Sequence, residues 1–438
     1  MLSGIMLVLG LLVMKHEKIT GRLHQLEPRE FLFFTYMFHM LLGERSFAYL
    51  GFEPLFVTEI VIAALALLYA KDLLQVRKIL VVYYLIVLTG ILFAFAYVAD
   101  FKVNALRDSL LLIYAVWVPI VYHVFRRENL YELFIVLLKV FIVIKAFHYV
   151  YDATLIFLGL KAVTFEGFRF GVGYIMPALI VISIFLPLKH FGWTYKLLSL
   201  IMFPAVFTIF HRSIFLGLFV AAGIIFLIGG RRTQKTILAY GFTGLGLLTI
   251  FLIYYNSVID VNIFNILEAK SSMDEGNINY RMLSWQTVME KFYTHALLGY
   301  GVGRPVMYEQ FNLFYETLNV SYFDLRNLGG NVQPHNSYIH ILARYGIFVF
   351  PLFLYAIFRP LFQFAKYIQS KKRNHMEAYV RFLLLCGFLF FMYVFAFFNV
   401  VLESPHHSFP YWLAIGMLLS YGRAGNFSPA ILRIKRED

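Results

Sequence analysis

Residues 79–98 read ILVVYYLIVLTGILFAFAYV, a stretch of 20 residues without a charged side chain. As an α-helix, a segment of this length crosses the roughly 30 Å hydrocarbon core of a bilayer. The composition agrees, because 61% of the 438 residues are hydrophobic and only 14% are charged, against about 25% charged residues in soluble proteins. The sequence therefore predicts an integral membrane protein and excludes an ordinary soluble globule.

Further apolar windows along the chain predict more spanning helices. With the quoted stretch, the windows are 2–14, 30–43, 54–70, 79–98, 108–125, 130–149, 170–188, 196–211, 213–229, 236–255, 341–365, 379–402 and 409–421. We predict an all-α, polytopic membrane bundle of about 12 to 13 transmembrane helices. Window 2–14 has neither a basic region before it nor a small-residue cleavage site, which favours a retained segment over a signal peptide.

The basic residues predict the orientation. Lys and Arg recur in alternate loops, namely Lys15/Lys18/Arg22, Lys71/Arg77/Lys78, Arg126/Arg127, Lys189/Lys196, Arg231/Arg232/Lys235, Lys366/Lys371/Lys372/Arg373 and Arg423/Arg433/Lys435/Arg436. Such loops are cytoplasmic by the positive-inside rule, so the net charge of +13 is a topology signal and predicts no nucleic-acid partner. The long loop that follows residue 255 faces outward. We expect an N-terminal bundle over 1–255, a large periplasmic loop region over 256–340, and C-terminal helices with a cytoplasmic tail over 341–438.

The sequence offers little for a metal or cofactor. Cys386, the single cysteine, lies inside an apolar run, so no intramolecular disulfide forms and no cysteine metal site is built. An Asp-x-Asp pair and a Cys/His cluster at metal-ligand spacing are both missing from the sequence. We therefore predict no metal and no cofactor. The long outer loop is rich in Tyr, Phe and Asn, which suits either sugar binding or anchoring at the headgroup level.

Several basic residues fall at or inside apolar windows on the outer half. They are Lys139, Lys145, Arg169, Arg212 and Arg344. A charge near mid-membrane costs about 2.5 to 3.5 kcal/mol on insertion scales, so such residues usually face a cavity and mark function. Snorkelling is the alternative, most readily for Lys145 and Arg169. Arg281 could join this set from the outer loop. Arginines with few acids nearby favour an anion such as diphosphate, which their planar fork of donors suits.

The stretch 333–347, QPHNSYIHILARYGI, carries a recognisable pattern. His335 and Gly346 are separated by ten residues, Arg212 is followed by Leu216, and Arg281 precedes Trp285 and the run LLGYGVG. In this order, over roughly residues 160–420, the elements resemble the O-antigen ligase and polymerase family. One departure is His211 before Arg212, where relatives often have Ser, and it leaves the surroundings of Arg212 open.

The resemblance implies a GT-C-type membrane glycosyltransferase in the bacterial inner membrane, with a periplasmic active site. Such enzymes move a glycan en bloc from undecaprenyl diphosphate to an acceptor glycan or to lipid A core. His335 is then the expected general base. We expect Arg212, Arg281, Arg344 and Arg169 to bind the diphosphate. The residues expected to support the site or the acceptor are Asn336, Tyr338 and Glu403.

Other interpretations remain open at this stage. The residues do not separate a polymerase, which joins repeat units, from a ligase, which moves a finished chain; the long loop slightly favours a polymerase. A transporter or flippase for lipid-linked oligosaccharide is the competing class. A transferase using polyprenyl monophosphate sugars would place an acidic base at Glu44 or Glu53. His340 and Arg344 either line the cavity or pack, and Glu403, His406 and His407 predict a solvated turn near the acceptor groove.

Overall fold

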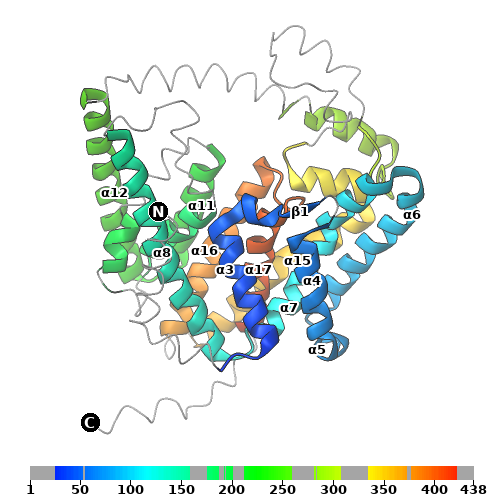
Figure 1. Cartoon of the computed structure of the whole chain (residues 1–438), viewed down its shortest axis with the longest axis horizontal. Helices are drawn as coiled ribbons and strands as arrows, with labels where there is room; N and C mark the ends of the chain where they lie inside the picture. The colour runs from blue at the N-terminus through cyan, green and yellow to red at the C-terminus, as the bar shows by residue number, and fades with distance from the viewer. Residues whose placement is uncertain are drawn as a thin grey trace.

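The structure is a computed structural model that describes residues 25–52, 55–157, 175–186, 192, 194–200, 212–258, 281–282, 284–306, 334–371 and 376–421. Among these residues the regular structure is helical (Figure 1), apart from one antiparallel pair of two-residue strands. In this pair, β1 (Gly51–Phe52) and β2 (Leu55–Phe56) align Gly51 with Phe56. The predicted all-α class is confirmed. Window 2–14, Arg169, Glu53 and the tail after residue 421 lie outside the described residues.

Where the structure describes the predicted windows, the helices follow them; residues 201–211 of window 196–211 lie outside the described residues. The helices are α3 (Pro28–Ala48), α4 (Val57–Leu68), α5 (Ala70–Leu74), α6 (Val81–Ile113), η1 (Tyr114–Val116), α7 (Trp117–Val124), α8 (Glu128–Phe157), α9 (Ile175–Ile184), α11 (Arg212–Ile228), α12 (Arg231–Val258), α15 (Ser337–Lys371), α16 (Met376–Phe398) and α17 (Pro405–Tyr421). Within the described part, 4 helical stretches are long and apolar enough to cross a membrane, and Val57–Leu68 and Ser213–Ile228 are shorter apolar helices. The chain is therefore a polytopic membrane protein.

α6 is a helical hairpin rather than one straight rod. At Lys102 the backbone takes φ 46° and ψ −123°, which is not helical. Before and after this point the chain packs against itself, because a methyl group placed on Gly90 would lie 3.0 Å from Ile113 and 3.1 Å from Leu112. Windows 79–98 and 108–125 are thus two segments that pack together, as their separate apolar runs predict. Only glycine allows so close an approach at position 90.

The centre of the bundle is aromatic. Trp117 of α7 stacks on Tyr36 of α3 with ring centroids 5.1 Å apart, and Phe409 of α17 meets the same indole ring at 4.8 Å. Trp117, Tyr36 and Phe409 are buried. Offset and edge-to-face ring pairs stabilise beyond their buried area. The cluster joins an early helix to the last one described, and so holds the ends of α6 and α17 in place near the site below.

Ion pairs join the loops before α3, after α5 and before α8 at one end of the bundle. Arg29 contacts Asp72 at 2.6 Å, and Arg127 contacts Glu30 at 2.7 Å. These loops are among those predicted to be cytoplasmic. The opposite end carries β1 and β2 (Figure 1), and three helices change direction with positive φ at Glu44, Lys102 and Gly346. The polar and titratable side chains of the candidate site lie at this second end.

Candidate functional site

α15 is broken at Gly346, the glycine of the His-x10-Gly pattern. Its backbone has φ 75° and ψ −178°, a left-handed conformation that glycine adopts without penalty. A methyl group here would lie 2.3 Å from the carbonyl oxygen of Leu297 and 2.5 Å from the amide nitrogen of Gly299. Gly346 is therefore required twice, for its dihedral angles and for the close approach of another backbone.

The approaching backbone belongs to residues 295–303, which contain the LLGYGVG run. Breaking a helix frees carbonyls and amides that must find other partners. The carbonyls of Ala343 and Arg344 accept hydrogen bonds from the amides of Tyr300 (2.7 Å) and Gly301 (3.1 Å). On the other side of the break, the Ile347 amide donates to the Ala296 carbonyl at 2.9 Å. The glycine-rich run is thus joined to the break by main-chain hydrogen bonds.

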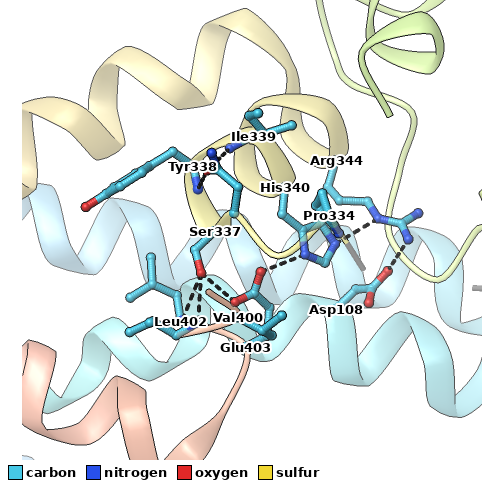
Figure 2. Close-up of polar contacts among 12 residues, drawn as sticks. Asp108, Pro334, Ser337, Tyr338, Ile339, His340, Arg344, Val400, Leu402 and Glu403 are labelled. Atoms are coloured by element: carbon cyan, nitrogen blue, oxygen red, sulfur yellow. Dashed lines mark hydrogen bonds and ion pairs between the residues drawn. The ribbon is translucent and has the colours of Figure 1, made fainter. Parts of the chain in front are cut away.

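Beside the break, four charged or titratable side chains form a continuous row (Figure 2). Arg344 Nη2 lies 3.1 Å from Asp108 Oδ2, and Arg344 Nε donates to His340 Nε2 at 3.2 Å. His340 Nδ1 lies 2.7 Å from Glu403 Oε1. Arg344 is only 2% exposed, and its Nη1 donates to the carbonyls of Gly301 and Arg304. Its donors are therefore directed at protein groups.

The hydrogen bonds define the protonation of His340. Arginine nitrogens only donate, so His340 Nε2 accepts and carries no proton. The ring proton then lies on Nδ1 and is donated to Glu403. The His340 ring thus bridges the Arg344 guanidinium and the Glu403 carboxylate, while Asp108 lies on the other side of Arg344.

The row continues through Ser337 to α16 and α11. Ser337 Oγ donates to Glu403 Oε2 at 2.7 Å and accepts from the amides of Val401 and Leu402 at 3.0 and 3.2 Å. Ser337 Oγ also lies 3.3 Å from the main-chain carbonyl of Asn399. The side-chain nitrogen Nδ2 of Asn399 donates to Ser213 Oγ at 2.9 Å. Ser213 directly follows Arg212. Hydrogen bonds thus connect the first turn of α15 with the first turn of α11.

His335 precedes this turn in an unusual backbone conformation. Its φ is 47°, which is uncommon for a residue with a side chain, and such strained residues are enriched at functional sites. Asn336 caps α15, since its Oδ1 accepts from the amides of Tyr338 and Ile339 at 3.0 Å each. Trp285 Nε1 donates to the Pro334 carbonyl. The residues on both sides of His335 are therefore fixed.

Arg281 acts electrostatically on His335. Burial and then the charge of Arg281 lower the pKa of His335 to about 4, while Glu403 raises it. Arg281 lies one helical turn before Trp285, which holds Pro334. The imidazole is accordingly neutral at physiological pH and able to accept a proton.

The predicted residues differ in how much the structure says about them. Arg212 begins α11, and its segment meets Ser337 through Asn399. Tyr338 donates from its hydroxyl to the Tyr393 carbonyl at 3.2 Å. The roles predicted for these residues, for Arg281 and for Arg344 stay predictions. The solvated turn predicted around Glu403 is wrong, because the Glu403 side chain is 8% exposed and bonded to His340.

Two further participants, Asp108 and Asn399, were not predicted from the sequence. Asp108 pairs with Arg344 and also accepts from the Gly303 amide at 2.8 Å. Asn399 links α11 with α15. Gly299 and Gly303, which belong to the LLGYGVG run cited from the sequence, have φ of 78° and 76°. A signal for Asp108 existed, since it is an acid at the outer start of an apolar run, at the level predicted for Arg344.

Comparison with known families agrees with this geometry. The family model described as O-antigen ligase matches residues 197–354. This range begins before α11, spans the Trp285 and LLGYGVG segments, and ends just after the Gly346 break. A search of curated proteins gave no match. The motif order and this match show that the segment 197–354 is similar to the O-antigen ligase family, and the long apolar helices make the chain a multi-pass membrane protein.

Proposed function

We propose that this protein is a glycosyltransferase that moves a glycan en bloc from undecaprenyl diphosphate to an acceptor sugar at the periplasmic face of the inner membrane. One observation supports it most. The segments that carry Arg212, Arg281 and His335 converge through Asn399, Ser337 and Trp285. In an enzyme of this family, the groups that bind the leaving diphosphate and activate the acceptor must meet at one anomeric carbon.

The reaction assigns a distinct task to each residue. The acceptor hydroxyl attacks the anomeric carbon, the bond from that carbon to the diphosphate oxygen breaks, and His335 takes the hydroxyl proton. Arg212 and Arg281 stabilise the charge that develops on the departing lipid diphosphate. Asn336 and Tyr338 fix the start of α15 behind His335.

Arg344 and Glu403 act as positioning residues in this proposal. Arg344 has its donors directed at Asp108, His340, Gly301 and Arg304. We therefore assign it to the support of the broken helix rather than to diphosphate. Glu403 holds His340 and Ser337, and its charge favours protonation of His335. That electrostatic effect helps the base when it receives the proton.

A transfer assay with the purified protein in nanodiscs tests the proposal. With an undecaprenyl diphosphate-linked glycan as donor, we expect a product of higher mass, and we expect its formation to continue in EDTA because arginines neutralise the diphosphate. Longer lipid-linked glycans from donor alone indicate a polymerase, whereas a conjugate that needs lipid A core indicates a ligase. Movement of donor across the bilayer without a new glycosidic bond would support a flippase instead. Activity lost in EDTA and restored by magnesium would contradict the metal-free mechanism.

The low pKa of His335 predicts activity in mild acid. Because kcat/KM reports the free enzyme, its acid limb should lie near pH 4, the value to which the pKa of His335 is lowered. An ordinary histidine with a pKa of about 6.5 would be about 90% protonated at pH 5.5 and would lose about tenfold in rate. We expect kcat/KM at pH 5.5 to stay close to its value at pH 7.5.

The lowered pKa of His335 also makes the free energy of unfolding depend on pH, so thermal unfolding is the control for the activity measurement. The folded state disfavours the charged imidazole of His335. The contribution of the neutral imidazole to the free energy of unfolding is therefore present above pH 6.5 and is lost as the pH falls towards 4. Thermal unfolding at both pH values shows whether the enzyme stays folded during the assay. A tenfold fall in kcat/KM at pH 5.5 with the fold intact would show that the base has an ordinary pKa or is not His335.

A further inference from the structure

Basic side chains collect at the start of α12 in a part of the sequence that has no acids. Residues 167–259 contain seven Lys and Arg and no Asp or Glu. Three of the seven, Arg231, Arg232 and Lys235, are exposed in the first two turns of α12, and we call them the α12 basic cluster. Within the described part of the chain, none of them pairs with a carboxylate. Like charges at this helical spacing repel one another, so the cluster favours a bound anion.

The cluster lines a groove large enough for a lipid headgroup. The groove has a volume of about 660 Å³, and Arg231, Arg232 and Lys235 line it together with Tyr240, more than one turn further along α12. Lys196 adds a fourth cation, because its Nζ lies 5.9 Å from the centroid of the Tyr240 ring. A water molecule takes up about 30 Å³ in the liquid, so the groove has room for a group much larger than a water molecule.

The turn between α11 and α12 keeps the basic side chains directed outward. Gln234 Nε2 donates to the Phe226 carbonyl near the end of α11 at 3.0 Å, and the Gly229 amide donates to the Ile225 carbonyl at 2.7 Å. Thr233 is buried, and a methyl group on Gly229 would lie 2.8 Å from its Cγ2. The two residues inside the cluster thus contact the protein, and the cations stay exposed.

The cluster lies at the end of the bundle away from the candidate functional site. α11 begins beside that site, where Ser213 accepts a hydrogen bond from Asn399, and its 17 residues extend for about 25 Å. α12 therefore begins at the opposite end, which the basic loops predict to be cytoplasmic. It lies at the edge of the bundle (Figure 1), where lipids have access to it.

The residues that follow the cluster indicate what kind of anion fits. Leu238, Phe242 and Leu245 are 50, 72 and 52% exposed on α12. In a spanning helix, exposed apolar side chains contact the acyl chains of lipids. An anion carried on acyl chains would contact both the cluster and these side chains, whereas a free phosphate ion would contact only the cluster.

We propose that the groove at the start of α12 binds the headgroup of an anionic phospholipid from the leaflet predicted to be cytoplasmic. The two arginines offer paired donors that match phosphate oxygens, and Lys196 and Lys235 add point charges. The N-terminus of α12 contributes the positive end of the helix dipole. Basic pockets beside membrane helices on the cytoplasmic side bind such headgroups. The proposal does not depend on glycan transfer, because the groove lies far from the residues assigned to it.

Lipid titrations of the full-length protein in detergent, followed by native mass spectrometry, test the groove. The probes are phosphatidylglycerol, cardiolipin and zwitterionic phosphatidylcholine. We expect the triple variant Arg231→Gln/Arg232→Gln/Lys235→Gln to bind both anionic lipids about 100-fold more weakly, since each basic side chain near an anionic lipid adds about fivefold in affinity. The double variant Arg231→Lys/Arg232→Lys keeps the charge and should lose much less. Phosphatidylcholine should bind weakly to every variant.

A matched control removes as many charges from other loops predicted to be cytoplasmic. Lys71, Lys78 and Arg126 are exposed, so the variant Lys71→Gln/Lys78→Gln/Arg126→Gln has the same net charge as the triple variant and leaves the groove intact. It should bind phosphatidylglycerol as the parent does. Thermal unfolding without lipid checks that both variants are folded. If the triple variant does not fold, Arg231→Gln and Arg232→Gln alone should each lose about fivefold.

Three results would overturn the site. Affinity for phosphatidylglycerol within twofold of the parent in the folded variants of the cluster would show that the groove does not bind it. An equal loss in the control variant would show that net charge acts and not the groove. Displacement of phosphatidylglycerol by an equal concentration of inorganic phosphate would show a site for free anions instead of a lipid site.

Discussion

Replacing His335 with glycine is expected to lower glycan transfer by about 10² to 10⁴, the usual cost of removing a general base, while donor binding stays nearly intact. In the proposed mechanism the neutral imidazole accepts a proton and does not hold the diphosphate. The measurement is donor affinity together with the single-turnover rate in nanodiscs. Alanine would be a poorer replacement, because His335 has φ 47° and alanine keeps the strain that glycine relieves.

Two comparisons make this experiment decisive. Lys102→Gly makes the same replacement at another left-handed residue, φ 46°, and should transfer at the normal rate. Arg281→Ala should weaken donor binding as well as turnover, because a charge-assisted bond to phosphate exists before the transition state. If His335→Gly loses donor binding as severely as Arg281→Ala but turns over bound donor normally, His335 is a positioning residue and the base lies elsewhere.

The helices could be predicted because each is encoded by one continuous run of apolar residues. A run such as 79–98 must bury its backbone polar groups internally, so its length and lack of charge are sufficient to predict a spanning helix. Even the α6 hairpin follows from two apolar runs separated by the charged residues Asp100 and Lys102. Three of the basic loops predicted to share a side lie together, as the contacts of Arg29 with Asp72 and of Arg127 with Glu30 show.

The site was harder to predict because its contacts join distant parts of the chain. Arg344 suggested an anion-binding residue when its neighbours in sequence alone were considered. Its partner Asp108 lies 236 positions earlier in the chain, and the Arg344 to Asp108 distance of 3.1 Å depends on how α6 packs against α15. A charge pattern within one helix carries no information about such a partner. The His-x10-Gly pattern was recognisable in the sequence. The structural reason for its glycine, which is the backbone of residues 296–301 hydrogen-bonded to the break in α15, was not.

Gly346→Ala tests that reason, and its expected effect on stability is the largest of any substitution considered. A methyl group would sit 2.3 Å from the Leu297 carbonyl oxygen at a φ of 75°. Left-handed strain costs about 1–3 kcal/mol, and forcing extra volume into a packed site costs about 1–3 kcal/mol more. We therefore expect thermal unfolding in detergent to shift down by several degrees. Transfer should fall as well, because the hydrogen bonds from Tyr300 and Gly301 to the break would be lost.

Gly246→Ala supplies the matched control, since Gly246 lies in α12 with no atom within 4 Å of the added methyl group. In an open helix interior alanine is favoured over glycine by about 1 kcal/mol, so this variant should unfold at the same or a higher temperature. The contrast isolates the conformation and crowding at Gly346 from the chemistry of the substitution, which is identical. If Gly346→Ala unfolds at the temperature of Gly246→Ala and transfers normally, the helix is not broken there and the convergence of the catalytic segments loses its main support.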